Sequence, residues 1–153
     1  MTRSTAREIA VLLGFSVASN GESAETHLDQ FFEKEHYATM AEENEVFSEY
    51  PNAKQMEYIR SVVHLIGDHR AELDAYIEKY ARGWTVGRIS RTAAAILRCA
   101  MCEILWLPDV PDAAAINEAV ELAKKYEDEE VVSFINGILG SFVRGETEKT
   151  EQS

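Results

Sequence analysis

The two cysteines, in the spacing Cys99-x-x-Cys102, are the residues whose types most readily suggest chemistry. Such a pair serves in thiol–disulfide exchange or supplies half of a structural zinc site. Here it lies in the middle of a predicted helix, with Leu97 before it and Ile104 after it. A redox pair needs a helix N-terminus that stabilises the thiolate, and a zinc site needs two further ligands. We therefore expect two buried core cysteines.

The histidines and carboxylates show no arrangement typical of an active site. His64 and His69 are five residues apart, which places them on different faces of a helix. The sequence has no His-Glu-x-x-His motif, no phosphate-binding glycine loop and no nucleophile elbow. The acidic run from Glu127 to Glu130 has the pattern of a solvated surface. The sequence predicts no catalysis, no metal and no cofactor.

Arg98 is a charged residue in a segment that is otherwise almost uncharged. A guanidinium among apolar residues needs a partner, so we expect a structural ion pair or network. The candidate partners are Glu103, Glu118 and Glu121.

Two further helical runs each carry an asparagine among apolar residues. Asn117 lies in one run and Asn136 in the other. Asparagine is a mediocre helix former, and buried amides find hydrogen-bond partners. We therefore expect Asn117 and Asn136 to be polar contacts that lock two helices together. The apolar stripes around them are Ile116, Val120 and Ala123 in the first run, and Phe134, Ile138 and Phe142 in the second.

Arg3 and Arg7 lie one turn apart at the start of a predicted helix. The helix dipole disfavours cations at this end, so their placement hints at an anionic partner. Two solvated arginines are the alternative explanation.

The composition is that of an ordinary globular protein, 46% hydrophobic and 27% charged. No apolar run approaches the roughly 18 residues of a membrane span, and we expect no secretory signal. Because the sequence contains two cysteines, we expect a protein of the reducing cytoplasm and not one held together by disulfide bonds. The net charge of −12 argues against generic binding of polyanions. Any nucleic acid must therefore meet a local basic spot or be shared with a partner.

Hydrophobic periodicity predicts an all-α helical bundle of about six to seven helices in two packed subdomains. The expected subdomains are residues 1–83 and 84–144, followed by a flexible tail at 145–153. Gly14 is expected to allow close helix packing. The expected helices are 3–19, 24–46, a helix with Pro51 in its first turn and a bend at Gly67 that runs to about Tyr80, 91–107, 113–126 and 131–144.

Several of these runs together resemble one family. Ile96-Leu97-Arg98-x-Ala100-x-x-Glu103 is followed by Val110-Pro111, by the run from Ile116 to Lys124, and by the run from Phe134 to Leu139. In order and spacing this pattern resembles the NusB family of bacterial transcription antitermination factors. The resemblance covers nearly the whole chain and is weakest between Ser23 and Tyr50.

The resemblance implies two helical subdomains and no catalysis. It implies binding to the boxA element of ribosomal RNA leaders, together with the ribosomal protein NusE, within an RNA polymerase antitermination complex. By position it implies RNA contacts for Arg3, Arg7, Glu130 and Phe134, and a NusE contact for Phe15. Phe134 and Phe15 also fit core positions. A monomer and a homodimer are both compatible with the sequence.

Three other functions remain as alternatives. One is a protein-interaction adaptor of the same fold with little RNA binding, favoured by the net charge and by the thin arginine run. Another is an association with RNA methyltransferases, to which NusB-like domains are also fused, although this chain has no room for a cofactor-binding domain. The last is a redox protein built on the two cysteines.

Overall fold

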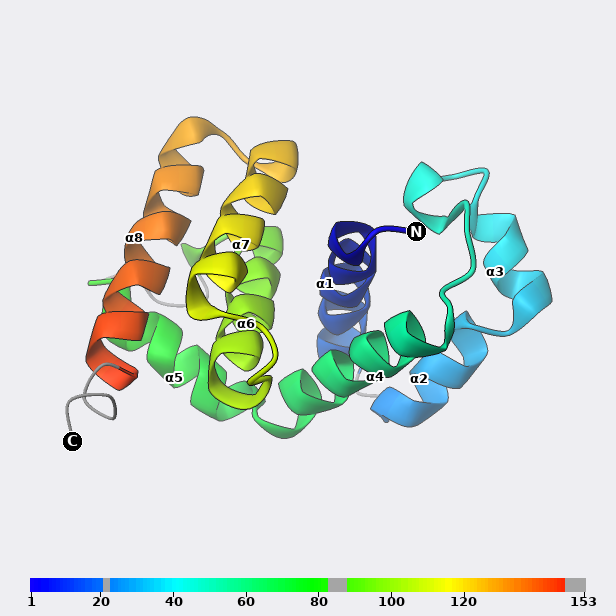
Figure 1. Ribbon diagram of the computed structural model, residues 1–153, viewed down its shortest axis with the longest axis horizontal. Helices are drawn as coiled ribbons and strands as arrows, with labels where there is room; N and C mark the ends of the chain where they lie inside the picture. The colour runs from blue at the N-terminus through cyan, green and yellow to red at the C-terminus, as the bar shows by residue number, and fades with distance from the viewer. Residues whose placement is uncertain (21–22, 83–87, 148–153) are drawn as a thin grey trace. The chain divides into compact units, whose positions relative to one another are not determined.

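The computed structural model describes residues 1–20, 23–82 and 88–147, without the side chains of residues 15–20. These residues form eight α-helices and one short 3-10 helix, with no strand among them (Figure 1). The all-α prediction is confirmed, and the predicted count of six to seven helices is nearly right. The helices are α1 (Arg3–Asn20), α2 (Ala24–Phe31), α3 (Lys34–Met40), η1 (Glu45–Phe47), α4 (Ala53–Asp68), α5 (Arg70–Tyr80), α6 (Arg91–Trp106), α7 (Asp112–Tyr126) and α8 (Glu129–Glu146).

The N-terminal unit, residues 1–68, is built around the packing of α1 against α4. Its buried apolar side chains include Ile9 from α1 and Ile59 from α4. A Cβ atom added at Gly14 would lie 3.2 Å from Cδ1 of Ile66 on α4. The two helices therefore approach closely at Gly14, as the sequence predicts.

The single helix expected over 24–46 is wrong, because the chain forms α2, α3 and η1 instead. Helix α2 ends at Phe31, and Glu33 begins α3, because its carboxylate accepts hydrogen bonds from the backbone N–H groups of His36 and Glu35. These two bonds, that from His36 first, lower the pKa of Glu33. Asn44 caps η1 through the N–H of Val46. Local capping thus divides a continuous helical pattern.

The helix expected to run from Pro51 to about Tyr80 is also divided, at His69 and not at Gly67. The His69 ring stacks on Trp106 of α6, with ring centroids 4.3 Å apart. The break allows α5 to pack against α6 and α8. The two compact units consequently divide between Asp68 and His69, earlier in the chain than the predicted boundary at residues 83 and 84.

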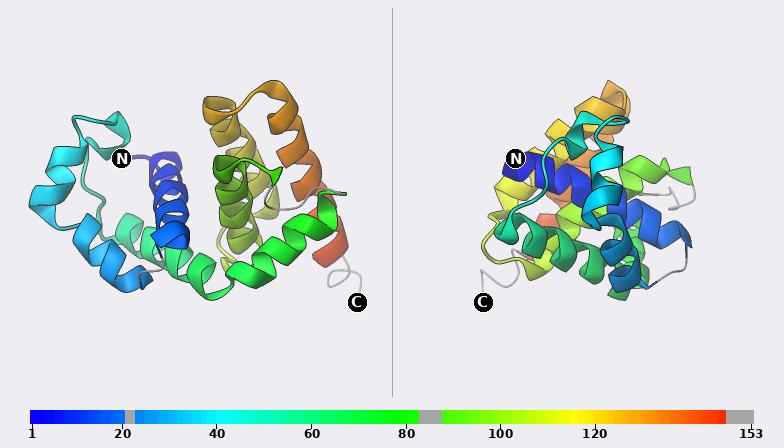
Figure 2. Two further views of the ribbon diagram at one scale, coloured as in Figure 1. Left: turned by 180° about the vertical axis from the view of Figure 1, so that it is seen from behind. Right: turned by 90° about the vertical axis from the view of Figure 1, so that its right-hand side faces the viewer.

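In the C-terminal unit, α6, α7 and α8 lie side by side, and α5 packs against α6 and α8 (Figures 1 and 2). Helix α6 is the centre, since every residue from Ala93 to Glu103 is buried. Ser90 caps α6 and Asp128 caps α8, each through a side-chain oxygen. The expected connector before α6 falls partly on residues 83–87, and the expected tail mostly on residues 148–153, both outside the described residues.

Of the stripe predicted for α7, which is Ile116, Val120 and Ala123, only Ala123 lies on the buried face of the helix. Ala115, Ala119 and Ala123 are buried, whereas Ile116 and Val120 are half-buried. Small residues along this stripe allow α7 to lie close to its neighbours. On α8 the buried side chains are Ile135, Ile138, Leu139 and Phe142.

Within the described ranges, no helix combines the length and the apolar character that a membrane span requires.

Candidate functional site

The N-terminal arginines meet at one aromatic ring. The guanidinium carbon of Arg3 lies 4.5 Å from the ring centroid of Tyr58, and that of Arg7 lies 5.8 Å from it. Both distances fall within the range of a cation–π contact. Tyr58 belongs to α4, so the packing of α4 on α1 supplies the ring that orders both arginines.

The two arginines differ in exposure. Arg3 is exposed, whereas Arg7 is 5% exposed and Tyr58 is 7% exposed. A guanidinium that rests on an aromatic face keeps its N–H groups at the edge, where they can donate to an oxyanion. The first turn of α1, which carries Arg3, contains no acidic residue. Arg3 is therefore placed to meet an anion directly, with Arg7 beneath it as a second positive charge.

Glu130 and Phe134 lie one turn apart at the beginning of α8, in the C-terminal unit. Asp128 fixes this helix start, since its carboxylate accepts the N–H of Val131 at 3.0 Å. Glu130 is exposed and Phe134 is half-buried. A half-buried ring beside an exposed carboxylate can offer one face for stacking and one acceptor for a hydrogen bond.

Phe15 lies in α1, but its side chain falls outside the described residues. The structure therefore brings Arg3 and Arg7 together and places Glu130 and Phe134 next to each other. These two pairs belong to separate compact units.

The structural role predicted for Arg98 is confirmed, but the predicted partners are wrong. Its Nε donates to Oδ1 of Asp74 on α5 at 2.7 Å, and the guanidinium side chain is 6% exposed. Asp74 also accepts from Nε of Arg70 at 3.3 Å. Among the predicted partners, Glu121 pairs with Lys124 instead. The ion pair joins α5 to the central helix α6.

The prediction that Asn117 and Asn136 are buried polar contacts is wrong. Both side chains are exposed, so neither is a buried amide that must find a protein partner. Glu118, next to Asn117, is half-buried. The helix pair α7–α8 is instead held by its apolar face.

The prediction for the cysteines is confirmed, since Cys99 and Cys102 are free thiols and both are buried. Burial raises the pKa of the Cys102 thiol, and the carboxylate of Glu103 raises it further. Cys99 donates a weak hydrogen bond to the same carboxylate. In the part of the chain that the structure describes, no three His, Cys, Asp or Glu side chains gather as a metal site would require.

Sequence reasoning missed two residues that matter here, Tyr58 and Asp74. Tyr58 lies off the apolar stripe predicted for its helix, and only the packing of α4 on α1 reveals its role. Asp74 is 24 positions from Arg98 in the sequence. A signal that could have identified Asp74 is its position between Leu73 and Ile77, which are both buried. An unpaired carboxylate beside them would cost free energy, so Asp74 needs a cationic partner.

The chain is similar to known proteins over nearly its whole length. A model of the NusB family matches residues 4–144. A transcription antitermination protein NusB from Acetivibrio thermocellus is 39% identical over 145 residues, which covers 94% of this chain and 90% of the relative. A relative of the same name from Natranaerobius thermophilus is 37% identical over 139 residues, covering 91% and 92%.

Solved structures show the same architecture. A structure of T. maritima NusB matches with a TM-score of 0.77 at 25% identity, covering 99% of this chain and 98% of that one. A crystal structure of the antitermination factors NusB and NusE in complex with double-stranded RNA matches with a TM-score of 0.71 at 25% identity, covering 94% and 96%. With the family match and this likeness in fold, the chain belongs to the NusB family.

Proposed function

We propose that this chain is a transcription antitermination factor that binds boxA-type RNA of ribosomal RNA leaders together with NusE. In this role it joins an RNA polymerase complex in the cytoplasm and supports ribosomal RNA transcription and maturation, without catalysing a reaction. The observation that carries the proposal is the match over nearly the whole chain to relatives named transcription antitermination protein NusB. A solved relative that is bound to both NusE and RNA supports it further.

The charge of the chain explains why a partner is needed. At a net charge of −12, long-range electrostatics oppose the approach of RNA phosphates. A second protein that supplies part of the phosphate contacts lets a locally basic point such as Arg3 contribute without a basic surface. We therefore expect RNA affinity to depend strongly on NusE.

The residues take distinct roles in this proposal. Arg3 donates to a phosphate, the Tyr58 ring holds Arg3 in place, and Arg7 adds a second positive charge. Phe134 stacks on an unpaired base, which contributes about 1–3 kcal/mol in comparable sites. Glu130 accepts a hydrogen bond from a base amino group. Phe15 contacts NusE.

The proposal is tested by fluorescence anisotropy with a labelled boxA RNA, this chain and purified NusE. We expect a salt-sensitive ternary complex near physiological salt and much weaker binding when NusE is omitted. A scrambled RNA of equal length is the control. The absence of a ternary complex would contradict the proposal.

A second candidate function is a protein-interaction adaptor with little RNA binding. The burial of Arg7, together with the net charge, favours it. Recovery of NusE by this chain in a pull-down, with no added protection of the RNA, would support this function over the first.

A further inference from the structure

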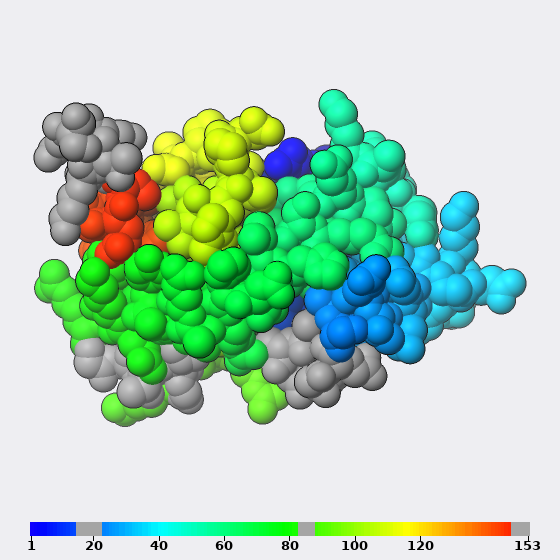
Figure 3. Space-filling model, turned by 90° about the horizontal axis from the view of Figure 1, so that it is seen from below, coloured from blue at the N-terminus to red at the C-terminus, as the bar shows by residue number. Residues whose placement is uncertain are grey.

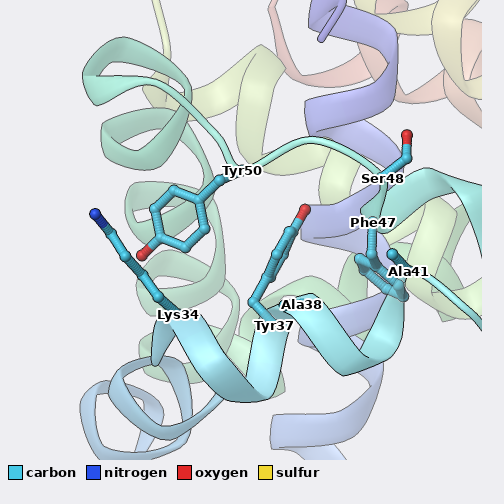
Figure 4. A pocket seen from close by; sticks show the side chains of 7 residues that line it. All are labelled: Lys34, Tyr37, Ala38, Ala41, Phe47, Ser48 and Tyr50. Atoms are coloured by element: carbon cyan, nitrogen blue, oxygen red, sulfur yellow. The ribbon is translucent and has the colours of Figure 1, made fainter.

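The N-terminal unit contains an aromatic pocket that the proposed RNA site does not use. It has a volume of about 410 Å³ and lies between α3, η1 and the segment that follows η1. Figure 4 shows Tyr37 in the pocket with Tyr50 and Phe47, and with Lys34 and Ser48 at its edges. This pocket is an open, aromatic-lined surface site.

The aromatic walls are held in fixed orientations. The hydroxyl of Tyr37 donates to the carbonyl of Glu49 and that of Tyr50 donates to the carbonyl of Phe32, each at 2.7 Å. The rings of Tyr37 and Tyr50 meet edge to face, with centroids 5.2 Å apart. Rings that are already ordered can accept a ligand without a further entropy cost.

Tyr50 is unusual in its exposure. At 41%, it is the one large hydrophobic side chain classed as exposed among those that the structure describes. Its hydroxyl bond and ring contacts hold it in place although it faces solvent. A rigid, exposed tyrosine beside a pocket is typical of a binding anchor.

The charge around the pocket is mostly negative. Residues 23–50 contain eight carboxylates and one cation, Lys34, so this segment has a net charge of −7. All eight carboxylates are exposed. Figure 3 shows part of this segment, α2 and the beginning of α3 (blue to light blue), at the molecular surface. Glu35 and Glu42 are each adjacent in sequence to a residue that lines the pocket, and so is Glu49, whose carboxylate already pairs with the N-terminal ammonium of Met1.

The pocket already holds a cation of its own. The amine of Lys34 lies 5.6 Å from the ring centroid of Tyr50, within the range of a cation–π contact. The ring face therefore accepts a positive charge, and Lys34 stands in for the group that would bind there.

We propose that this pocket is a docking site for a basic polypeptide segment. An arginine of that segment lies against the exposed ring of Tyr50 in place of the Lys34 amine, and neighbouring basic residues face the exposed glutamates. RNA is disfavoured at this site, because the same carboxylates repel phosphates. The inference does not depend on the RNA-binding function proposed above.

The test uses fluorescence anisotropy with the full chain and a labelled peptide of alternating glycine and arginine. The matched probes are the same peptide with glutamate in place of arginine, and single-stranded oligouridine. Lys34→Ala removes the competing cation, and Lys54→Ala removes a charge from the exposed part of α4 as the control. Tyr50→Ala removes the ring, and Tyr50→Phe keeps it.

We expect the arginine peptide to bind and the glutamate peptide not to bind. Lys34→Ala should tighten peptide binding about threefold more than Lys54→Ala does, because it frees the ring face. Tyr50→Ala should weaken binding about three- to tenfold, and Tyr50→Phe should bind as the parent chain does. Circular dichroism checks that each variant is folded.

Two results would overturn the proposal. The first is arginine-peptide binding that is no stronger than that of the glutamate peptide, or that is equal in Lys34→Ala, Lys54→Ala and Tyr50→Ala. The second is oligouridine binding that Lys34→Ala weakens and Lys54→Ala does not, which would make the pocket an RNA site.

Discussion

Replacement of Tyr58 by leucine should weaken RNA binding without changing its dependence on salt. The ring of Tyr58 contacts the guanidinium groups of Arg3 and Arg7 at 4.5 Å and 5.8 Å from its centroid. Leucine fills much of the same buried space but has no aromatic face. The substitution therefore leaves both positive charges present and removes the surface that holds them in place.

The size of the effect follows from the cost of ordering Arg3. An exposed arginine that loses its ring contact must be immobilised when RNA binds, at a cost of about 0.5–1.5 kcal/mol. That cost corresponds to a loss of about two- to twelvefold in affinity for the ternary complex. Because Tyr58 is 7% exposed, the free energy of unfolding should also fall, by about 1–3 kcal/mol.

The assay is a salt titration of the ternary complex by fluorescence anisotropy, with each variant first checked by circular dichroism. Tyr58→Phe keeps the ring and is the matched control, expected to bind within about twofold of the parent chain. Parent-like affinity in Tyr58→Leu would refute the positioning role. A salt slope that changes in Tyr58→Leu would also refute it, because the loss would then be one of charge contact.

Further predictions concern charge, stability and reactivity. Arg3→Ala should reduce the salt slope of RNA binding by about 0.7–1, since it removes one contact to a single-stranded phosphate. Asp74→Ala should lower the free energy of unfolding by about 3 kcal/mol, and Tm by about 6–12 °C, because it leaves the 6%-exposed guanidinium of Arg98 without its partner. Urea and thermal unfolding measure this loss. Cys99 and Cys102 should resist a thiol reagent in the native state and react on unfolding, since both are buried and burial raises the pKa of Cys102.

Controls sharpen these experiments. Lys54→Ala removes an exposed lysine and should leave the RNA salt slope close to that of the parent chain. Asp109→Ala removes an exposed carboxylate and should change stability by less than about 0.5 kcal/mol. A loss as large as that of Asp74→Ala would show that net charge, and not the buried ion pair, sets the stability. Rapid labelling of the native cysteines would contradict their core position.

The sequence predicts the helical architecture well wherever local signals are strong. The helix expected over 91–107 is α6 (Arg91–Trp106), and the apolar periodicity of α8 survives in the structure. The division of residues 24–46 depends on capping by Glu33, which competes with a continuous helical pattern. The break at His69 depends on a tertiary contact with Trp106, which local periodicity does not contain.

The candidate site is less predictable because it also depends on tertiary contacts between helices that are distant in the sequence. Arg98 needs a partner on any physical argument, but its choice of Asp74 is set by the packing of α5 on α6. Asn117 and Asn136 occupy helical positions between apolar residues, and a rotation of the helix face by one residue is enough to expose such side chains. The contact of Arg3 with Tyr58 joins two helices that are far apart in the sequence.

The most direct test of the central claim is photo-crosslinking of a boxA RNA that carries 4-thiouridine, in the complex of this chain with NusE. The crosslinked peptides are identified by mass spectrometry. We predict crosslinks on this chain near Arg3 and near Phe134, which are lost when the RNA sequence is scrambled. Crosslinks confined to NusE, with none on this chain, would contradict the claim that this chain binds RNA.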